Sequence, residues 1–261
     1  IIMNAPFHTG LAPELFKLRT DDFVLLKRTG AFVGYAKAEL IGGELWGVLK
    51  QSDDEPESDA SIPIRLRVAD YERLDAEGAF EAAGRTELVD GFVYRMSPQY
   101  RPHAFAKVEI AYRLRRALEA MGSTIHVGIE QSVDLDVHSE PQPDIILTTE
   151  PRGEGAIPGS SVLLIVEVSN ATLDFDLGVK ADLYANAGVP EYWVVDLNEN
   201  RVLMHANPRP DGRSYDGQLN VLSRDTLCAA TIVRLEVETA GLGYPNSVFE
   251  GASIHPARKY L

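Results

Sequence analysis

The chain has 261 residues, 45% of them hydrophobic, which is typical of one globular domain with a small extension. Its single cysteine excludes an internal disulfide, and no apolar run approaches the roughly 20 residues that a transmembrane helix needs, so we expect a soluble cytoplasmic protein with no membrane partner. The net charge of −14 opposes nucleic-acid binding unless lysines and arginines form a local basic patch.

The N-terminal third contains an internal repeat. Residues 18–51 align without gaps on residues 66–99, and eleven of the 34 aligned pairs are identical. Each copy predicts a short helix, a glycine turn and a two-stranded hairpin. The acidic segment 51–61 between the copies is predicted to be a linker or an exposed loop.

These patterns divide the chain into an N-terminal extension (1–61), a main domain (62–240) and an irregular tail (241–261). A helix and a hairpin cannot bury enough surface to stand alone. We therefore expect the first copy either to extend the edge of the central sheet or to pack at a homodimer interface.

The main domain is predicted to be an α/β fold. After the second copy, the apolar periodicity and the turn signals indicate a helix, three strands, a helix and a strand, at 102–121, 124–136, 143–147, 161–168, 175–186 and 191–197. This order, αβββαβ, predicts a mixed sheet flanked by helices. Further antiparallel strands are expected at 201–205 and 232–237.

The first helix of this domain carries the best candidate for a basic patch. Its cations are Arg101, Lys107, Arg113, Arg115 and Arg116. Arg113 and Arg116 are the candidates for phosphate contacts. The alternative is an ordinary solvated helix face.

Two carboxylates lie in apolar strands of this domain. Asp144 opens the strand 143–147, and Glu167 interrupts the strand 161–168. Burying an ionised carboxylate costs several kcal/mol unless a cation or hydrogen-bond donors compensate it. If the two strands are neighbours, about 4.8 Å apart, the acids could hold one Mg²⁺ or Mn²⁺ ion. The alternative is an Asp at a strand start and a Glu paired with a Lys or Arg.

Lys180, on the following helix, is the third candidate. Asp176 lies four residues before it, so the pair could equally be a surface ion pair worth a few tenths of a kcal/mol. Alternatively, its ammonium could point toward the two acids, because a buried acid pair without a metal needs a cation.

These residues resemble a known superfamily. Pro143-Asp144, then Glu167-Val168-Ser169, then a helical lysine before AGVPEYWVVD (187–196), are similar to the PD-(D/E)XK nucleases, and within them to the Uma-type bacterial family of restriction-endonuclease-like proteins. The resemblance covers residues 66–237. In the superfamily the lysine stands two residues after the second acid, where this chain has Ser169. The chain is similar to members in which the lysine lies on the next helix.

The resemblance implies a restriction-endonuclease-like core and Mg²⁺- or Mn²⁺-dependent hydrolysis of DNA by Asp144, Glu167 and Lys180. It also implies that Glu87, in the sequence ELVDG, and His103 lie near the metal, with Gln131 a further candidate for the same cleft. Glu87 could equally be a solvent-facing strand acid, and His103 a capping or structural residue. The alternative function is a nuclease fold that serves in binding or assembly without turnover.

Overall fold

The computed structural model describes residues 13–50, 60–96, 99–222 and 225–241. Its centre is a six-stranded mixed sheet with the order β14 (Tyr215–Leu222), β13 (Arg201–Pro208), β12 (Glu191–Asp196), β11 (Val162–Ser169), β9 (Ile145–Thr148) and β7 (His126–Ile129). β11 and β12 are parallel, and the other neighbouring pairs are antiparallel. The nearly continuous apolar sequences of β11 and β12 fit their place in the centre, where both faces are covered.

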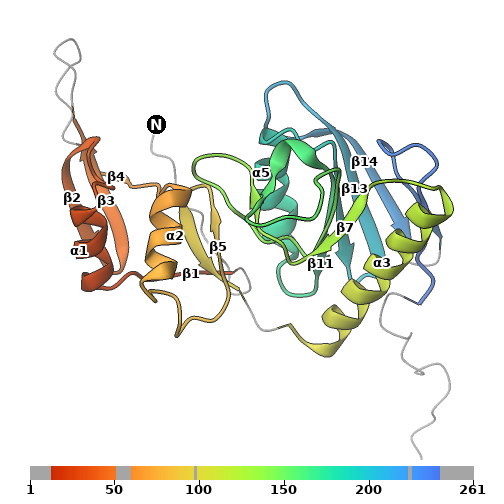
Figure 1. Cartoon of the computed structure of the whole chain (residues 1–261), viewed down its shortest axis with the longest axis horizontal. Helices are drawn as coiled ribbons and strands as arrows, with labels where there is room; N and C mark the ends of the chain where they lie inside the picture. The colour runs from red at the N-terminus through yellow and green to blue at the C-terminus, as the bar shows by residue number, and fades with distance from the viewer. Residues whose placement is uncertain (1–12, 51–59, 97–98, 223–224, 242–261) are drawn as a thin grey trace, which may run out of the picture.

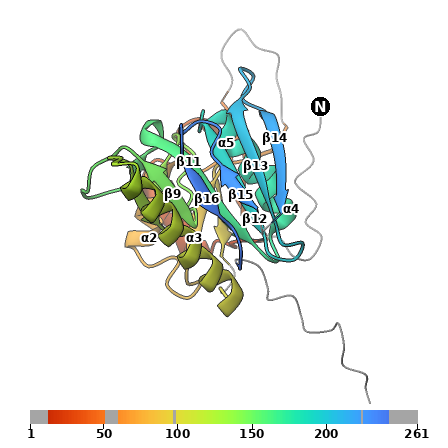
Figure 2. The ribbon, with the colours of Figure 1, turned by 90° about the vertical axis from the view of Figure 1, so that its right-hand side faces the viewer.

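Helices cover both faces of this sheet (Figures 1 and 2). On one face α3 (Arg101–Ala120) buries an apolar stripe of Ile110, Leu114 and Leu118, beside the small sheet of β15 (Thr226–Cys228) and β16 (Glu236–Glu238). On the other face lies a helical segment built from α4 (Leu173–Phe175), a π-helical turn η2 (Asp176–Lys180) and α5 (Ala181–Asn186). Alternate residues of each central strand therefore face α3 or α5. The predicted mixed α/β architecture is confirmed.

The repeat forms two similar units. The first contains α1 (Thr20–Arg28), β2 (Tyr35–Ile41) and β3 (Glu44–Leu49), and the second contains α2 (Val68–Ala76), β5 (Thr86–Val89) and β6 (Phe92–Arg95). Each has the predicted helix and hairpin.

The two copies exchange strands. β1 (Glu14–Leu15), which precedes the first copy, pairs with β6 of the second, whereas β4 (Ile62–Pro63), which precedes the second copy, pairs with β3 of the first. One apolar cluster, which includes Leu26, Leu74 and Phe80, spans both copies. Neither copy therefore completes its sheet or its core alone.

Three expectations are corrected. The first copy does not extend the central sheet, because β2, β3 and β4 form a separate sheet. The strand expected at 124–136 is interrupted by Glu130, whose φ of +52° ends β7, and β8 (Val133–Asp134) pairs instead with β10 (Ile157–Pro158). The strand expected at 232–237 is reduced to β16, because Arg234 adopts a φ of +69° just before it.

Residues 51–59 of the predicted linker and residues 242–261 of the predicted tail lie outside the described residues. Across the described part of the chain, no helix is long and apolar enough to span a membrane.

Candidate active site

Asp144 and Glu167 are brought together by the pairing of β9 with β11. Asp144 immediately precedes β9, and Glu167 lies within β11. The main-chain N–H of Asp144 donates to Glu167 Oε2 at 3.2 Å, and the N–H of Val168 donates to Asp144 Oδ2 at 2.9 Å. Both side chains are buried. The strand register therefore fixes the two carboxylates beside each other.

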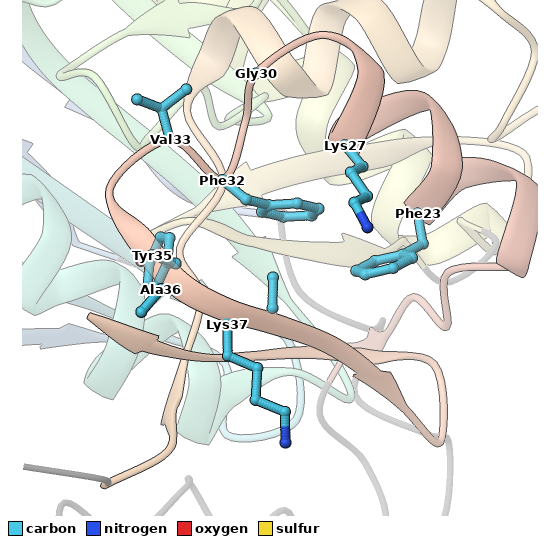
Figure 3. A pocket seen from close by; sticks show the side chains of 9 residues that line it. Phe23, Lys27, Gly30, Phe32, Val33, Tyr35, Ala36 and Lys37 are labelled. Atoms are coloured by element: carbon cyan, nitrogen blue, oxygen red, sulfur yellow. The ribbon is translucent and has the colours of Figure 1, made fainter. Parts of the chain in front are cut away.

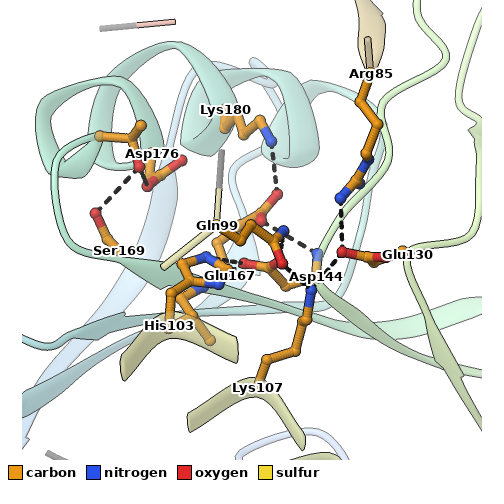
Figure 4. Close-up of polar contacts among 12 residues, drawn as sticks. Arg85, Gln99, His103, Lys107, Glu130, Asp144, Glu167, Ser169, Asp176 and Lys180 are labelled. Atoms are coloured by element: carbon orange, nitrogen blue, oxygen red, sulfur yellow. Dashed lines mark hydrogen bonds and ion pairs between the residues drawn. The ribbon is translucent and has the colours of Figure 1, made fainter. Parts of the chain in front are cut away.

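Lys180 points into the protein toward these acids. Its Nζ donates to Glu167 Oε1 at 2.8 Å (Figure 4) and lies 3.1 Å from Glu87 Oε1. The alternative surface pair with Asp176 is wrong, because both residues are buried in the π-helical turn. Ser169, which stands where the superfamily has its lysine, is hydrogen-bonded to Asp176 instead (Figure 4).

Glu87 contributes a third acid from β5 of the second repeat copy. It is fully buried, and its Oε2 accepts from the N–H of Gln142 at 3.2 Å. The solvent-facing alternative for this residue is therefore wrong. Its counterpart in the first copy, Glu39, is partly exposed and forms an ion pair of 3.0 Å with Lys37.

α3 supplies two nitrogen-bearing side chains on the opposite side of Asp144 (Figure 4). His103 Nε2 lies 3.1 Å from Asp144 Oδ2, and Lys107 Nζ lies 3.6 Å from Asp144 Oδ1. Lys107 also contacts the side-chain oxygens of Gln99 and Glu130. The sequence pattern indicates Lys107 only as part of the basic patch. Its spacing of four residues from His103, which puts both on one helix face, was the available signal.

Tyr184 was also missed. Its hydroxyl donates to Glu167 Oε1 at 2.9 Å from a fully buried position on α5. It lies four residues after Lys180, so the two side chains share a helix face. A polar tip on an otherwise apolar ring gives little sign in the sequence that it faces an acid.

Gln131, predicted for the same cleft, does not join this cluster, and the predicted phosphate contacts Arg113 and Arg116 lie outside it. Gln131 is exposed, and the preceding residue, Glu130, reaches Lys107 instead. Arg113 is held by Glu109 (2.9 Å) and by the carbonyl of Glu238 (2.7 Å). Arg116 is exposed, 5.8 Å from the centre of the Tyr112 ring. The basic patch is thus partly neutralised within the protein.

The buried charges shift one another's titration. Burial raises the pKa of Glu167 to about 8; Lys180 opposes this rise, and Asp144 and Asp176 add to it. Burial likewise raises the pKa of Asp176 to about 6, against the effect of Lys180. Burial also acts to raise the pKa of Asp144, but His103, the Val168 N–H and Lys107 outweigh it, so this pKa is lowered. Burial disfavours the Lys180 ammonium, yet Glu167, Glu87 and Asp176 raise its pKa well above the ordinary value.

The cluster's charge fits a divalent cation. The cluster contains four buried acids (Glu87, Asp144, Glu167 and Asp176) and two buried lysines (Lys107 and Lys180). If all six are ionised and His103 is neutral, the net charge of the cluster is −2. Among the described residues, no three or more His, Cys, Asp or Glu side chains are arranged to hold a metal. Mg²⁺, however, is commonly held by one or two carboxylates with waters and substrate phosphates. Asp144 and Glu167 fit that requirement.

Comparison with known proteins gives one family. The model of the Uma2 family, whose description is "Putative restriction endonuclease", matches residues 68–234. No curated protein matches the chain. Among solved structures, the chain is similar to the crystal structure of a putative nuclease belonging to DUF820 from Anabaena variabilis, with 12% identity and a TM-score of 0.47 over 63% of this chain and 89% of that one.

Proposed function

The chain belongs to the Uma2 family of putative restriction endonucleases, and from this premise we propose that it is a nuclease that hydrolyses DNA phosphodiester bonds with Mg²⁺ or Mn²⁺. The observation that carries the proposal is the buried cluster in which Lys180 contacts Glu167 beside Asp144. All three residues lie within the part of the chain that the family model matches. Apart from the two-residue strands β8 and β10 and a 3-10 turn, the order α3, β7, β9, β11, α4 to α5, β12 supports a restriction-endonuclease-like core.

Asp144 and Glu167 would hold the metal. When bound, a divalent ion polarises the scissile phosphate and lowers the pKa of a bound water. Lys180 stays protonated, because the surrounding acids raise its pKa. It therefore acts as a fixed cation that stabilises negative charge developing on the phosphate, rather than as a base. Tyr184 and Glu87 position Glu167 and Lys180 from two sides.

The substrate would approach where the polar side chains around the cluster are most exposed. These are His103 on α3, 15% exposed, Glu130 after β7, 35% exposed, and Arg85 before β5, 37% exposed. Arg85 contacts Glu130 at 2.6 Å, so a guanidinium stands at this rim. A DNA phosphate would replace the Glu130 carboxylate as the ionic partner of Arg85 or Lys107.

A cleavage assay tests the proposal. Plasmid, single-stranded and branched DNA would be incubated with the full chain in EDTA and in Mg²⁺ or Mn²⁺. We expect cleavage only with metal, its loss in Asp144→Asn and Glu167→Gln, and its retention in Glu77→Gln, which changes an exposed acid on the second repeat copy.

A nuclease fold that binds DNA without cleaving it is the second candidate. The observation that favours it is that all four carboxylate oxygens of Asp144 and Glu167 already have protein partners within 3.6 Å. Folded wild-type protein that binds these DNAs but leaves all of them intact in both metals would support this reading over the first.

A further inference from the structure

The strand β2 has an open edge. It pairs only with β3 in the sheet β2-β3-β4, at the end of the molecule away from the six-stranded sheet (Figure 1). Ile41 pairs with Glu44 across the Gly42-Gly43 turn. In a two-residue hairpin these flanking residues exchange main-chain hydrogen bonds, and the bonding direction alternates along the strand. The N–H and C=O groups of Ala38 and Leu40 therefore face outward, and no described residue pairs with them.

The second repeat copy uses the same edge for pairing. Leu88 and Glu140 exchange main-chain hydrogen bonds of 3.4 and 2.9 Å, and the Gly91 N–H donates to the His138 carbonyl at 2.7 Å. In the repeat alignment Leu88 corresponds to Leu40. The duplicated unit thus accepts an extended segment at this edge, and within the described part of the chain only the second copy has one, at 138–140.

The surface next to the open edge is also uncovered. A hollow of about 410 Å³ lies between α1, the following turn and β2, with the half-buried rings of Phe23 and Phe32 in its wall (Figure 3). Their counterparts Tyr71 and Phe80 are buried and stacked with ring centres 5.2 Å apart. Ile41, on β2 itself, is 56% exposed. The first copy therefore offers a strand edge with apolar surface beside it.

We propose that two copies of this chain associate through β2, pairing antiparallel about a two-fold axis at Ala38 to form one continuous sheet. The charges of the strand select this partner and register. With Ala38 on the axis, Lys37 lies opposite Glu39 of the partner subunit, and the pair occurs twice by symmetry. With Glu39 on the axis, two identical acids would face each other.

A lysine on an edge strand ordinarily discourages pairing with other strands. Here the acid two residues later matches that lysine in a second copy of the same strand, so β2 is complementary to itself and mismatched with most others. This inference concerns the N-terminal copy, which the family match excludes, and it does not depend on nuclease activity.

Charge reversal tests the pairing specifically. We would measure the dimer dissociation constant of the full chain by sedimentation equilibrium. Lys37→Glu or Glu39→Lys alone places like charges opposite each other twice, so each should raise the constant about tenfold or more. The double reversal should restore it, and a mixture of the two single variants should form a heterodimer. Lys37 and Glu39 also contact each other within one chain, so the double reversal restores that internal contact as well. Only the formation of the heterodimer shows that the two residues contact each other between chains.

Main-chain pairing is tested at Ala38. Ala38→Pro removes an outward N–H and should abolish the dimer, whereas Ala38→Ser keeps that N–H and should dimerise like the wild type; circular dichroism would verify that both are folded. A wild-type chain that stays monomeric, or a dimer that survives Ala38→Pro, overturns the proposal. A monomer whose Ala38 and Leu40 amides resist hydrogen exchange also overturns it, since another segment of the same chain would then cover the edge.

Discussion

Glu167 shows how a single buried acid ties stability to charge. Its carboxylate receives an ammonium and a hydroxyl on one oxygen and a main-chain N–H on the other, from Lys180, Tyr184 and Asp144. These donors do not fully replace water, because burial together with neighbouring acids still raises its pKa to about 8. The sequence showed that Glu167 needed a partner. It could not show that three elements would each supply one, since that depends on side-chain directions set by packing.

This shift predicts a pH dependence of stability without metal. The pKa of Glu167 is higher in the folded state than its ordinary 4.5, so the stability linked to its protonation is fully present below about 4.5 and is lost as the pH rises through about 8. Asp176, raised to about 6, adds a loss at lower pH in the same direction. In EDTA, the free energy of unfolding from urea titrations should therefore fall between about pH 5 and pH 9. Glu167→Gln should flatten this fall, and Glu77→Gln should not. Equal slopes in all three proteins would mean that Glu167 does not titrate in this range.

At the scale of the elements, continuous apolar runs and helical periodicity predicted the central strands and α3 well. β11 was expected at 161–168 and spans Val162–Ser169. Local backbone geometry was not predictable: the left-handed conformation of Glu130 splits an expected strand, and the π-helical turn that directs Lys180 inward has no pattern of its own. The exchanged strands β1 and β4 have two residues each, too few to show any periodicity. Their pairing is decided by tertiary contacts.

Strand exchange predicts that the repeat copies unfold together. Phe16, after β1, donates its N–H to Val93 of the second copy and packs against Phe80 with ring centres 5.1 Å apart. Its counterpart Ile64 donates to Leu45 of the first copy. Ile64→Ala should destabilise the chain by about 2–4 kcal/mol, because it leaves a cavity in the shared core, and Phe16→Ala should destabilise it less, because the Phe16 ring is only partly buried. Thermal unfolding followed by circular dichroism should remain a single transition. A separate early transition in either variant would show that the copies are independent.

For the whole molecule, the negative net charge and the buried acid cluster have opposite consequences for binding DNA. A net charge of −14 repels DNA at long range, whereas the cluster's excess of buried acids favours the divalent cation that we propose. Bound Mg²⁺ would relieve the repulsion among the acids and present positive charge to a phosphate. The family resemblance and the pattern of acids were available from the sequence. Tyr184 and Lys107 join the site through the packing of α5 and α3 around it, which the sequence pattern does not show.

Thermal unfolding of the full chain with increasing Mg²⁺, starting from EDTA, tests the proposed metal site most directly. If Asp144 and Glu167 hold the ion, the midpoint should rise with Mg²⁺ concentration, because a ligand that binds only the folded state stabilises it by mass action. Asp144→Asn and Glu167→Gln should abolish the rise, and Glu77→Gln should keep it. A wild-type midpoint that is indifferent to millimolar Mg²⁺ and Mn²⁺, or variants that respond like the wild type, would contradict the assignment and leave these acids a structural role.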